Sequence, residues 1–130
     1  MTRRHLGTCV VPSAAAHVAI GRRWLRGTIE SLPGFGDGAG DDAVLLLSEA
    51  LTNAIVHGGG EVVEVDAFFE DGALRVEVVD GGGGGVPRFS EEPCGEGGRG
   101  LPIMEAVARK WGYEAADGGR LRVWFEITFL

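Results

Sequence analysis

The chain has 130 residues, of which 45% are hydrophobic and 24% charged, as in ordinary globular proteins. Twelve Lys and Arg against nineteen Asp and Glu give a formal net charge of −7, which argues against the basic surface that nucleic-acid binding requires. No apolar run reaches the length of a membrane span, and the two cysteines lack metal-ligand spacing. We therefore expect one cytoplasmic domain over residues 1–130, with no membrane or direct nucleic-acid partner.

The N-terminal part predicts a strand followed by a helix. Residues 5–12 alternate in hydrophobicity and end at Pro12, as a short strand would. Ser13 is the expected N-cap of a helix that runs to about Ser31, before a loop over residues 32–40. The other side of this helix carries a basic cluster, which is either a solvated face or a docking patch for an acidic partner: Arg22, Arg23 and Arg26.

A second helix is expected to begin at Asp41 or its neighbour and to end at the glycines after His57. Glu49, Asn53 and His57 are four residues apart, so they point along one side of it. Most of the remaining surface is apolar, through Leu46, Leu47, Ala50, Leu51, Ala54 and Ile55. A carboxylate and an amide beside so apolar a surface are costly unless they bind something, so we interpret them as the wall of a site. For His57, an interaction with the last helix carbonyls is favoured over ligand contact.

The rest of the chain predicts two hairpins separated by a long loop and a helix. The expected strands cover 61–70, 73–80, 112–116 and 121–129, with turns at Asp71-Gly72 and at residues 117–119. Between the hairpins, residues 81–98 are rich in Gly, Pro and Glu, as in lids and binding loops, and a helix runs from about Gly100 to Lys110. The tryptophans Trp24, Trp111 and Trp124 are expected in the core. This order predicts an α+β two-layer sandwich, a mostly antiparallel sheet with helices on one face.

Three clusters suit a nucleotide. An Asn oxygen such as that of Asn53 is a hard ligand for Mg²⁺, and Glu49 one turn away could accept a proton. Asp80 ends a strand and is followed by glycines that allow close backbone approach, so its carboxylate could accept the amino proton of adenine. The helix start around Gly98 and Gly100 offers free N–H groups to phosphates.

In order and spacing these clusters resemble the GHKL ATPase superfamily, and within it the single-domain anti-sigma-factor serine kinases. The matching motifs are Glu49–His57 (EALTNAIVH), Asp80–Gly84 (DGGGG) and Gly98–Ile103 (GRGLPI), and the tail Val123–Glu126 resembles the closing strand. The resemblance covers roughly residues 10–130. It implies the Bergerat-type ATP-binding fold, with residues 81–98 as the ATP lid.

The resemblance also implies roles for individual residues. Asn53 would ligate Mg²⁺, Glu49 would be the catalytic base and Asp80 would hold adenine. The other residues expected to line the nucleotide are Gly82, Gly84, Gly98, Arg99, Gly100 and Leu101. The implied cofactors are ATP and Mg²⁺. The implied partners are a sigma factor and an antagonist protein phosphorylated on serine, and a homodimer is also implied.

One departure from the family pattern keeps alternatives open. The family usually has a Thr shortly before the closing strand that supports the adenine-binding aspartate, whereas this chain has Arg120-Leu121-Arg122. The chain is therefore either a serine kinase or a nucleotide-binding module that sequesters a regulator without turnover. A histidine-kinase catalytic domain is a weaker alternative, because no dimerising helix pair or phosphoacceptor-histidine segment precedes the ATP motifs.

Overall fold

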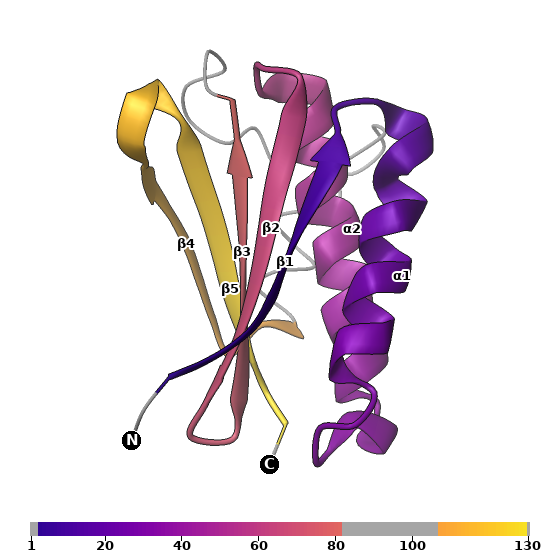
Figure 1. Cartoon of the computed structure of the whole chain (residues 1–130). Helices are drawn as coiled ribbons and strands as arrows, with labels where there is room; N and C mark the ends of the chain where they lie inside the picture. The colour runs from indigo at the N-terminus through magenta and orange to yellow at the C-terminus, as the bar shows by residue number, and fades with distance from the viewer. Residues whose placement is uncertain (1–2, 82–106, 130) are drawn as a thin grey trace.

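In the described part of the chain, five antiparallel strands form one sheet in the order β1-β2-β3-β5-β4, and two long helices cover one of its faces (Figure 1). The computed structural model describes residues 3–81 and 107–129. The strands are β1 (Arg4–Pro12), β2 (Val62–Glu70), β3 (Ala73–Asp80), β4 (Lys110–Ala115) and β5 (Leu121–Thr128). The helices are α1 (Val18–Ile29) and α2 (Ala39–His57), with short 3₁₀ turns at Ala15–His17, Phe35–Asp37 and Asp117–Gly119. The predicted α+β two-layer architecture is confirmed.

The core lies between the helices and the inner face of the sheet. Every second strand residue points inward, and the fully buried ones are apolar: Val11, Val63, Val65, Ala67, Leu74, Val76 and Phe125. The helices contribute Leu25, Ile29, Leu46, Leu47 and Leu51. The two helices approach closely at Gly21, because a Cβ placed there would lie 2.4 Å from Cδ1 of Leu51. Within the described residues no helix is long and apolar enough to span a membrane.

The β2–β3 hairpin follows its sequence closely. Asp71 and Gly72 both have positive φ, 52° and 74°, as a two-residue hairpin turn requires. The register pairs Glu70 with Ala73 and Glu64 with Val79. The hairpin therefore delivers the end of β3, with Asp80, to a fixed place in the sheet.

The start of α1 differs from the prediction. Ser13 does not cap the helix: its N–H donates to the carbonyl oxygen of Glu61 at 2.9 Å, which ties this segment to the residue before β2. A 3₁₀ turn at Ala15–His17 comes first, and neither this turn nor α1 has a side-chain cap. Pairing with a distant part of the chain thus overrides the local capping signal.

The two other helix boundaries also move. Gly38, at φ 92°, is the N-cap of α2, so the helix begins two residues before Asp41. Asp41 lies in the first turn, where its carboxylate complements the helix dipole and accepts a hydrogen bond from Arg26 at 3.1 Å. The helix predicted to reach Lys110 ends earlier: Ala108 is not helical, and Lys110 begins β4. Pairing of this segment with β5, including Arg109 N–H to Glu126 O at 2.8 Å, explains the difference.

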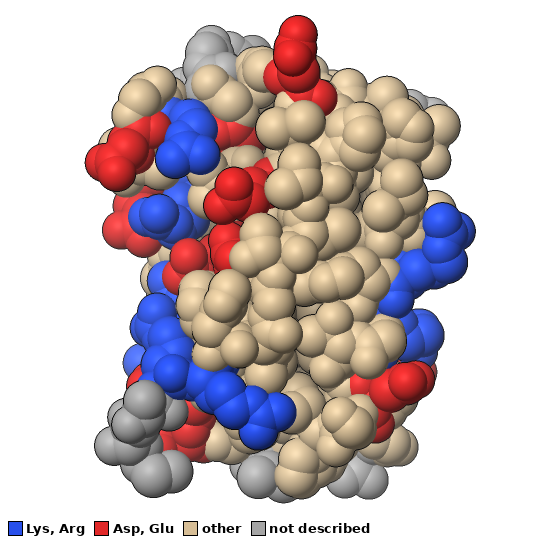
Figure 2. Space-filling view, viewed as in Figure 1, with Lys and Arg blue, Asp and Glu red and all other residues tan. Residues whose placement is uncertain are grey.

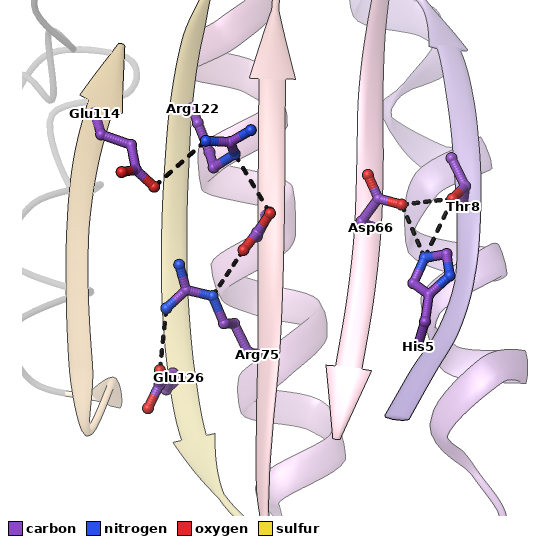
Figure 3. Close-up of polar contacts among 8 residues, drawn as sticks. His5, Thr8, Asp66, Arg75, Glu114, Arg122 and Glu126 are labelled. Carbon is purple, nitrogen blue, oxygen red and sulfur yellow. Dashed lines mark hydrogen bonds and ion pairs between the residues drawn. The ribbon is translucent and has the colours of Figure 1, made fainter. Parts of the chain in front are cut away.

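The outer face of the sheet carries a ladder of charges across β4, β5 and β3 (Figures 2 and 3). Glu77 pairs with Arg75 at 2.8 Å and with Arg122 at 3.3 Å. Arg75 continues to Glu126 at 3.1 Å, and Arg122 to Glu114 at 3.4 Å. Arg75 also lies over the ring of Trp124, 4.2 Å from its centroid. The prediction that Trp124 is a core residue was therefore wrong, whereas Trp24 and Trp111 do pack against the core.

Replacing Leu51 by Ala should reduce the free energy of unfolding by about 2–5 kcal/mol, because it leaves a cavity where α2 meets α1 and the sheet. Leu45, on the same helix but 43% exposed, is the matched control, and its replacement by Ala should cost about 1 kcal/mol or less. Urea unfolding followed by circular dichroism measures both. Equal losses for the two variants would contradict the packing described here.

Candidate functional site

Helix α2 presents Glu49 and Asn53 on one flank, one turn apart and each half-buried. At 100° per residue both lie about 160° around the helix axis from Leu51. Leu51 is the residue that faces Gly21 of α1. Glu49 and Asn53 therefore point away from α1, along the border between the buried stripe of α2 and its exposed side. That position suits a site wall, although their binding roles remain predictions.

Asp80 ends β3 on the inner face of the sheet and is only 7% exposed. No other charged residue in the described part of the chain is buried. A buried carboxylate is stable only when donors satisfy its oxygens. A carboxylate has several lone pairs, so an inward-facing one at a strand end can also accept a hydrogen bond from the edge of a bound ring, which stays a prediction for Asp80.

The carboxylate of Asp80 lies against the C-terminal end of α2. A Cβ placed on Gly58, the residue that ends the helix, would lie 2.7 Å from Oδ2 of Asp80. From Gly58, Asn53 is about 7.5 Å along the helix axis and Glu49 about 13.5 Å, at 1.5 Å per residue. Along this axis the predicted polar groups therefore follow the order Asp80, Asn53, Glu49. That they face one ligand stays a prediction.

The glycine turn that follows α2, residues 58–60, lies against the end of β3. The N–H of Gly81 donates to the carbonyl oxygen of Gly59 at 2.7 Å. A Cβ on Gly60 would lie 2.8 Å from Cα of Gly81, so the two backbones are in direct contact. From the sequence, these glycines were interpreted only as a helix stop. One glycine suffices to end a helix, so the run of three indicated that these glycines have a further role in packing.

Leu121 is the residue opposite Asp80 in the β3–β5 pairing. Directly paired residues share a face of the sheet with Cβ atoms about 5 Å apart. Leu121 therefore lies on the inner face beside the Asp80 carboxylate, where it offers no hydroxyl. The departure noted in the sequence is located at this one residue, since Arg122 points to the outer face and pairs with Glu77.

Six predicted site residues lie outside the described part of the chain, together with residues 82–98 of the predicted lid at 81–98: Gly82, Gly84, Gly98, Arg99, Gly100 and Leu101. Their contacts with phosphate therefore stay predictions. The described residues include Asp80, the predicted base end of the candidate site, and Asn53 and Glu49, its predicted wall.

Other reactive groups in the described residues form no competing site. Thr8, His5 and Asp66 cluster on the outer face of β1 and β2 (Figure 3). Nε2 of His5 faces both Asp66 and Thr8, whereas a nucleophile, a base and its orienting acid need both ring nitrogens. Burial raises the pKa of the Cys9 thiol, which makes it a poorer nucleophile. No group of three or more His, Cys, Asp or Glu residues able to hold a metal occurs within 3–81 and 107–129.

The basic cluster of α1 is exposed, as predicted, and borders a groove of about 200 Å³. The groove is lined by Ala19, Arg22, Arg23, Arg26 and Val44, so it lies between α1 and α2. In Figure 2 basic side chains lie along the right edge of the molecule, where α1 runs. Arg26 is ion-paired with Asp41, but both side chains are solvated, so the pair is weak and the groove keeps its positive character.

Comparison with known proteins gives two matches. The family model described as "Histidine kinase-like ATPase domain" matches residues 11–126. The "Anti-sigma F factor" of Clostridium acetobutylicum is 39% identical over 89 residues, which cover 60% of this chain and 62% of that protein. The matched stretch thus spans less than two thirds of the length of this relative. It nevertheless relates the chain to a protein whose name describes control of a sigma factor.

Replacing Leu121 by Thr should tighten binding of ATP by about 3- to 10-fold, because the hydroxyl could hydrogen-bond to the Asp80 carboxylate and orient it. Isothermal titration calorimetry measures the change. Leu121→Val, which has nearly the same shape without the hydroxyl, is the matched control. If the Thr and Val variants bind ATP equally, a hydroxyl at this position is of no use to the site.

Proposed function

The chain belongs to the histidine kinase-like ATPase domain family, and on this premise we propose that it is an ATP-binding regulatory serine kinase of the anti-sigma-factor type. It would sequester a sigma factor and phosphorylate an antagonist protein on serine. The observation that carries the proposal is the buried Asp80 carboxylate against the end of the helix that bears Asn53 and Glu49. The similarity to an anti-sigma F factor supports the regulatory part.

The described residues fit the base end of an adenine nucleotide. Asp80 is inward-facing and buried, and its carboxylate can accept a hydrogen bond from the exocyclic amino group of adenine. Glycine at positions 58, 60 and 81 lets the end of α2 pack directly against the end of β3, where Asp80 lies. Guanine presents a carbonyl where adenine presents this amino group, so a fixed carboxylate would select adenine.

Asn53 and Glu49 fit the phosphate end. Asn53 would hold Mg²⁺ through its side-chain oxygen, and the ion, when bound, would neutralise charge on the phosphates. Glu49 would accept the proton of the serine hydroxyl as its oxygen attacks the γ-phosphorus and ADP leaves. Beyond this proton transfer, positioning would provide most of the catalysis.

The partner surface is proposed from charge and exposure. The groove beside Arg22, Arg23 and Arg26 is positive on a chain whose formal net charge is −7. Acidic segments of a sigma factor or antagonist would be attracted there, and salt would weaken the attraction. A homodimer and a cytoplasmic location remain part of the proposal by family resemblance.

A nucleotide-binding module without turnover is the second candidate, and Leu121 favours it. An apolar side chain opposite Asp80 leaves the carboxylate without the hydroxyl that the family usually supplies. Weaker orientation of the base would still permit binding and sequestration. Phosphoryl transfer depends more strongly on exact placement of the reacting groups, because small displacements cost large factors in rate.

Replacing Asp80 by Ala should weaken ATP binding by at least about 10-fold, because the charged acceptor of the adenine amino group is lost. Calorimetry with and without Mg²⁺ gives the dissociation constants. Asp42→Ala is the control, since Asp42 is exposed at the other end of α2 and should leave ATP affinity unchanged. Full affinity in the Asp80 variant would remove adenine recognition from this residue and with it the basis of the proposal.

Replacing Glu49 by Gln should leave the affinity for ATP nearly unchanged and slow phosphoryl transfer by about 10²- to 10⁴-fold, because Gln cannot accept the proton. Transfer is measured with γ-labelled ATP and the proteins that copurify with the chain from its own cells. Glu30→Gln, at the exposed end of α1, is the control and should transfer at the wild-type rate. Tight ATP binding without any labelled protein in the wild type would establish the module and reject the kinase.

A further inference from the structure

Gly58 has no conformational need to be glycine. Its φ of −80° and ψ of 170° are open to any residue, unlike those of Gly60, whose φ is 95°. The reason for glycine at this position is therefore space. A Cβ on Gly58 would lie 2.4 Å from the carbonyl oxygen of Ala54, 2.7 Å from Oδ2 of Asp80 and 2.8 Å from Cβ of Asp80.

Asp80 has little freedom to move away from such a contact. Its backbone is paired with Leu121 at the end of β3, the strand that lies between β2 and β5. The next residue, Gly81, is hydrogen-bonded to Gly59 at 2.7 Å. A Cβ on Gly81 would lie 2.2 Å from the carbonyl oxygen of Gly59, so the turn and the strand end are in direct backbone contact.

We propose that Gly58 is a positioning residue that sets the orientation of the Asp80 carboxylate and thereby the preference of the site for an adenine base. This inference rests on the proposed ATP-binding function. Gly58 does not touch the nucleotide in this role. It forms the surface against which the carboxylate rests, and it links the orientation of that carboxylate to the end of the helix that carries Asn53 and Glu49.

Gly58→Ala tests the assignment, with Gly27→Ala as the matched control. Gly27 lies on the exposed side of α1, and a Cβ there would meet nothing within 4 Å. Calorimetry measures the dissociation constants of two ligands, ATP and purine riboside triphosphate, which lacks only the exocyclic amino group. The wild type and Gly27→Ala should prefer ATP by about 10- to 100-fold, the value of one charge-assisted hydrogen bond.

In Gly58→Ala the preference should fall to about 3-fold or less, while affinity for purine riboside triphosphate stays within about 3-fold of the wild type. In an Asp80→Ala background, Gly58→Ala should cause no further loss of preference, because the two residues act through one contact. A variant that binds both ligands more weakly but still prefers ATP would overturn the assignment, since that is what general disruption of the helix end produces.

The wild-type protein provides a second test that does not depend on folding of the variant. In nuclear magnetic resonance titrations, the amide signal of Gly58 should shift further with ATP than with purine riboside triphosphate, because both ligands bring the same ring but only ATP engages the carboxylate that rests on it. Equal shifts with both ligands would overturn the assignment.

A wild type that binds ATP without preferring it would overturn the adenine-binding role of Asp80 and, with it, the role of Gly58. Loss of preference in Asp80→Ala alone, with Gly58→Ala unchanged, would leave the proposed function intact and reject only the role of Gly58.

Discussion

Close contact between the end of α2 and the end of β3 determines how the candidate site is arranged. Three fully buried leucines, Leu46, Leu47 and Leu51, hold α2 against the sheet, so the helix has one orientation. The glycines that follow it allow its last turn to meet Asp80 and Gly81 without intervening side chains. The helix then carries Asn53 and Glu49 about one and a half and two and a half turns before its contact with the buried Asp80 carboxylate. A longer connection or bulkier residues would separate these groups.

Much of this arrangement could be predicted from the sequence because its signals are local. Asp71-Gly72 marks a hairpin turn through the positive φ of both residues, and the four-residue spacing of Glu49 and Asn53 places them on one flank. The position of Asp80 was predictable in the same way, since it ends an apolar strand and a glycine run follows it in the sequence, whereas its role in a site stays a prediction. The residues that bind phosphate by resemblance lie outside the described part of the chain, so that half of the site still rests on the sequence motifs alone.

The errors occurred where distant parts of the chain meet. Ser13 has the chemistry of an N-cap, but its N–H is taken by Glu61, forty-eight residues away in number. Trp124 has the hydrophobicity of a core residue, yet strand alternation puts it on the outer face, where Arg75 covers it. The importance of Gly58 depends on a contact with a strand twenty-two positions further on. The contacts of Ser13 and Gly58 form only when the sheet assembles, although the run of three glycines was a local signal. The outward position of Trp124 follows from strand alternation, which the sequence already contains.

The charge ladder on the outer face also bears on how this sequence can diverge. Its two arginines and three glutamates are shared among several pairings, and Arg75, Glu77 and Glu126 have side chains less than one fifth exposed. Reversing or deleting one charge leaves a partly buried neighbouring charge without its partner, which is destabilising. Exchanging both members of a pair keeps the charges paired. Across homologous chains, Glu77, Arg75 and Arg122 should therefore vary together or not at all. This covariation would come from the face opposite the nucleotide and could be mistaken for a trace of function.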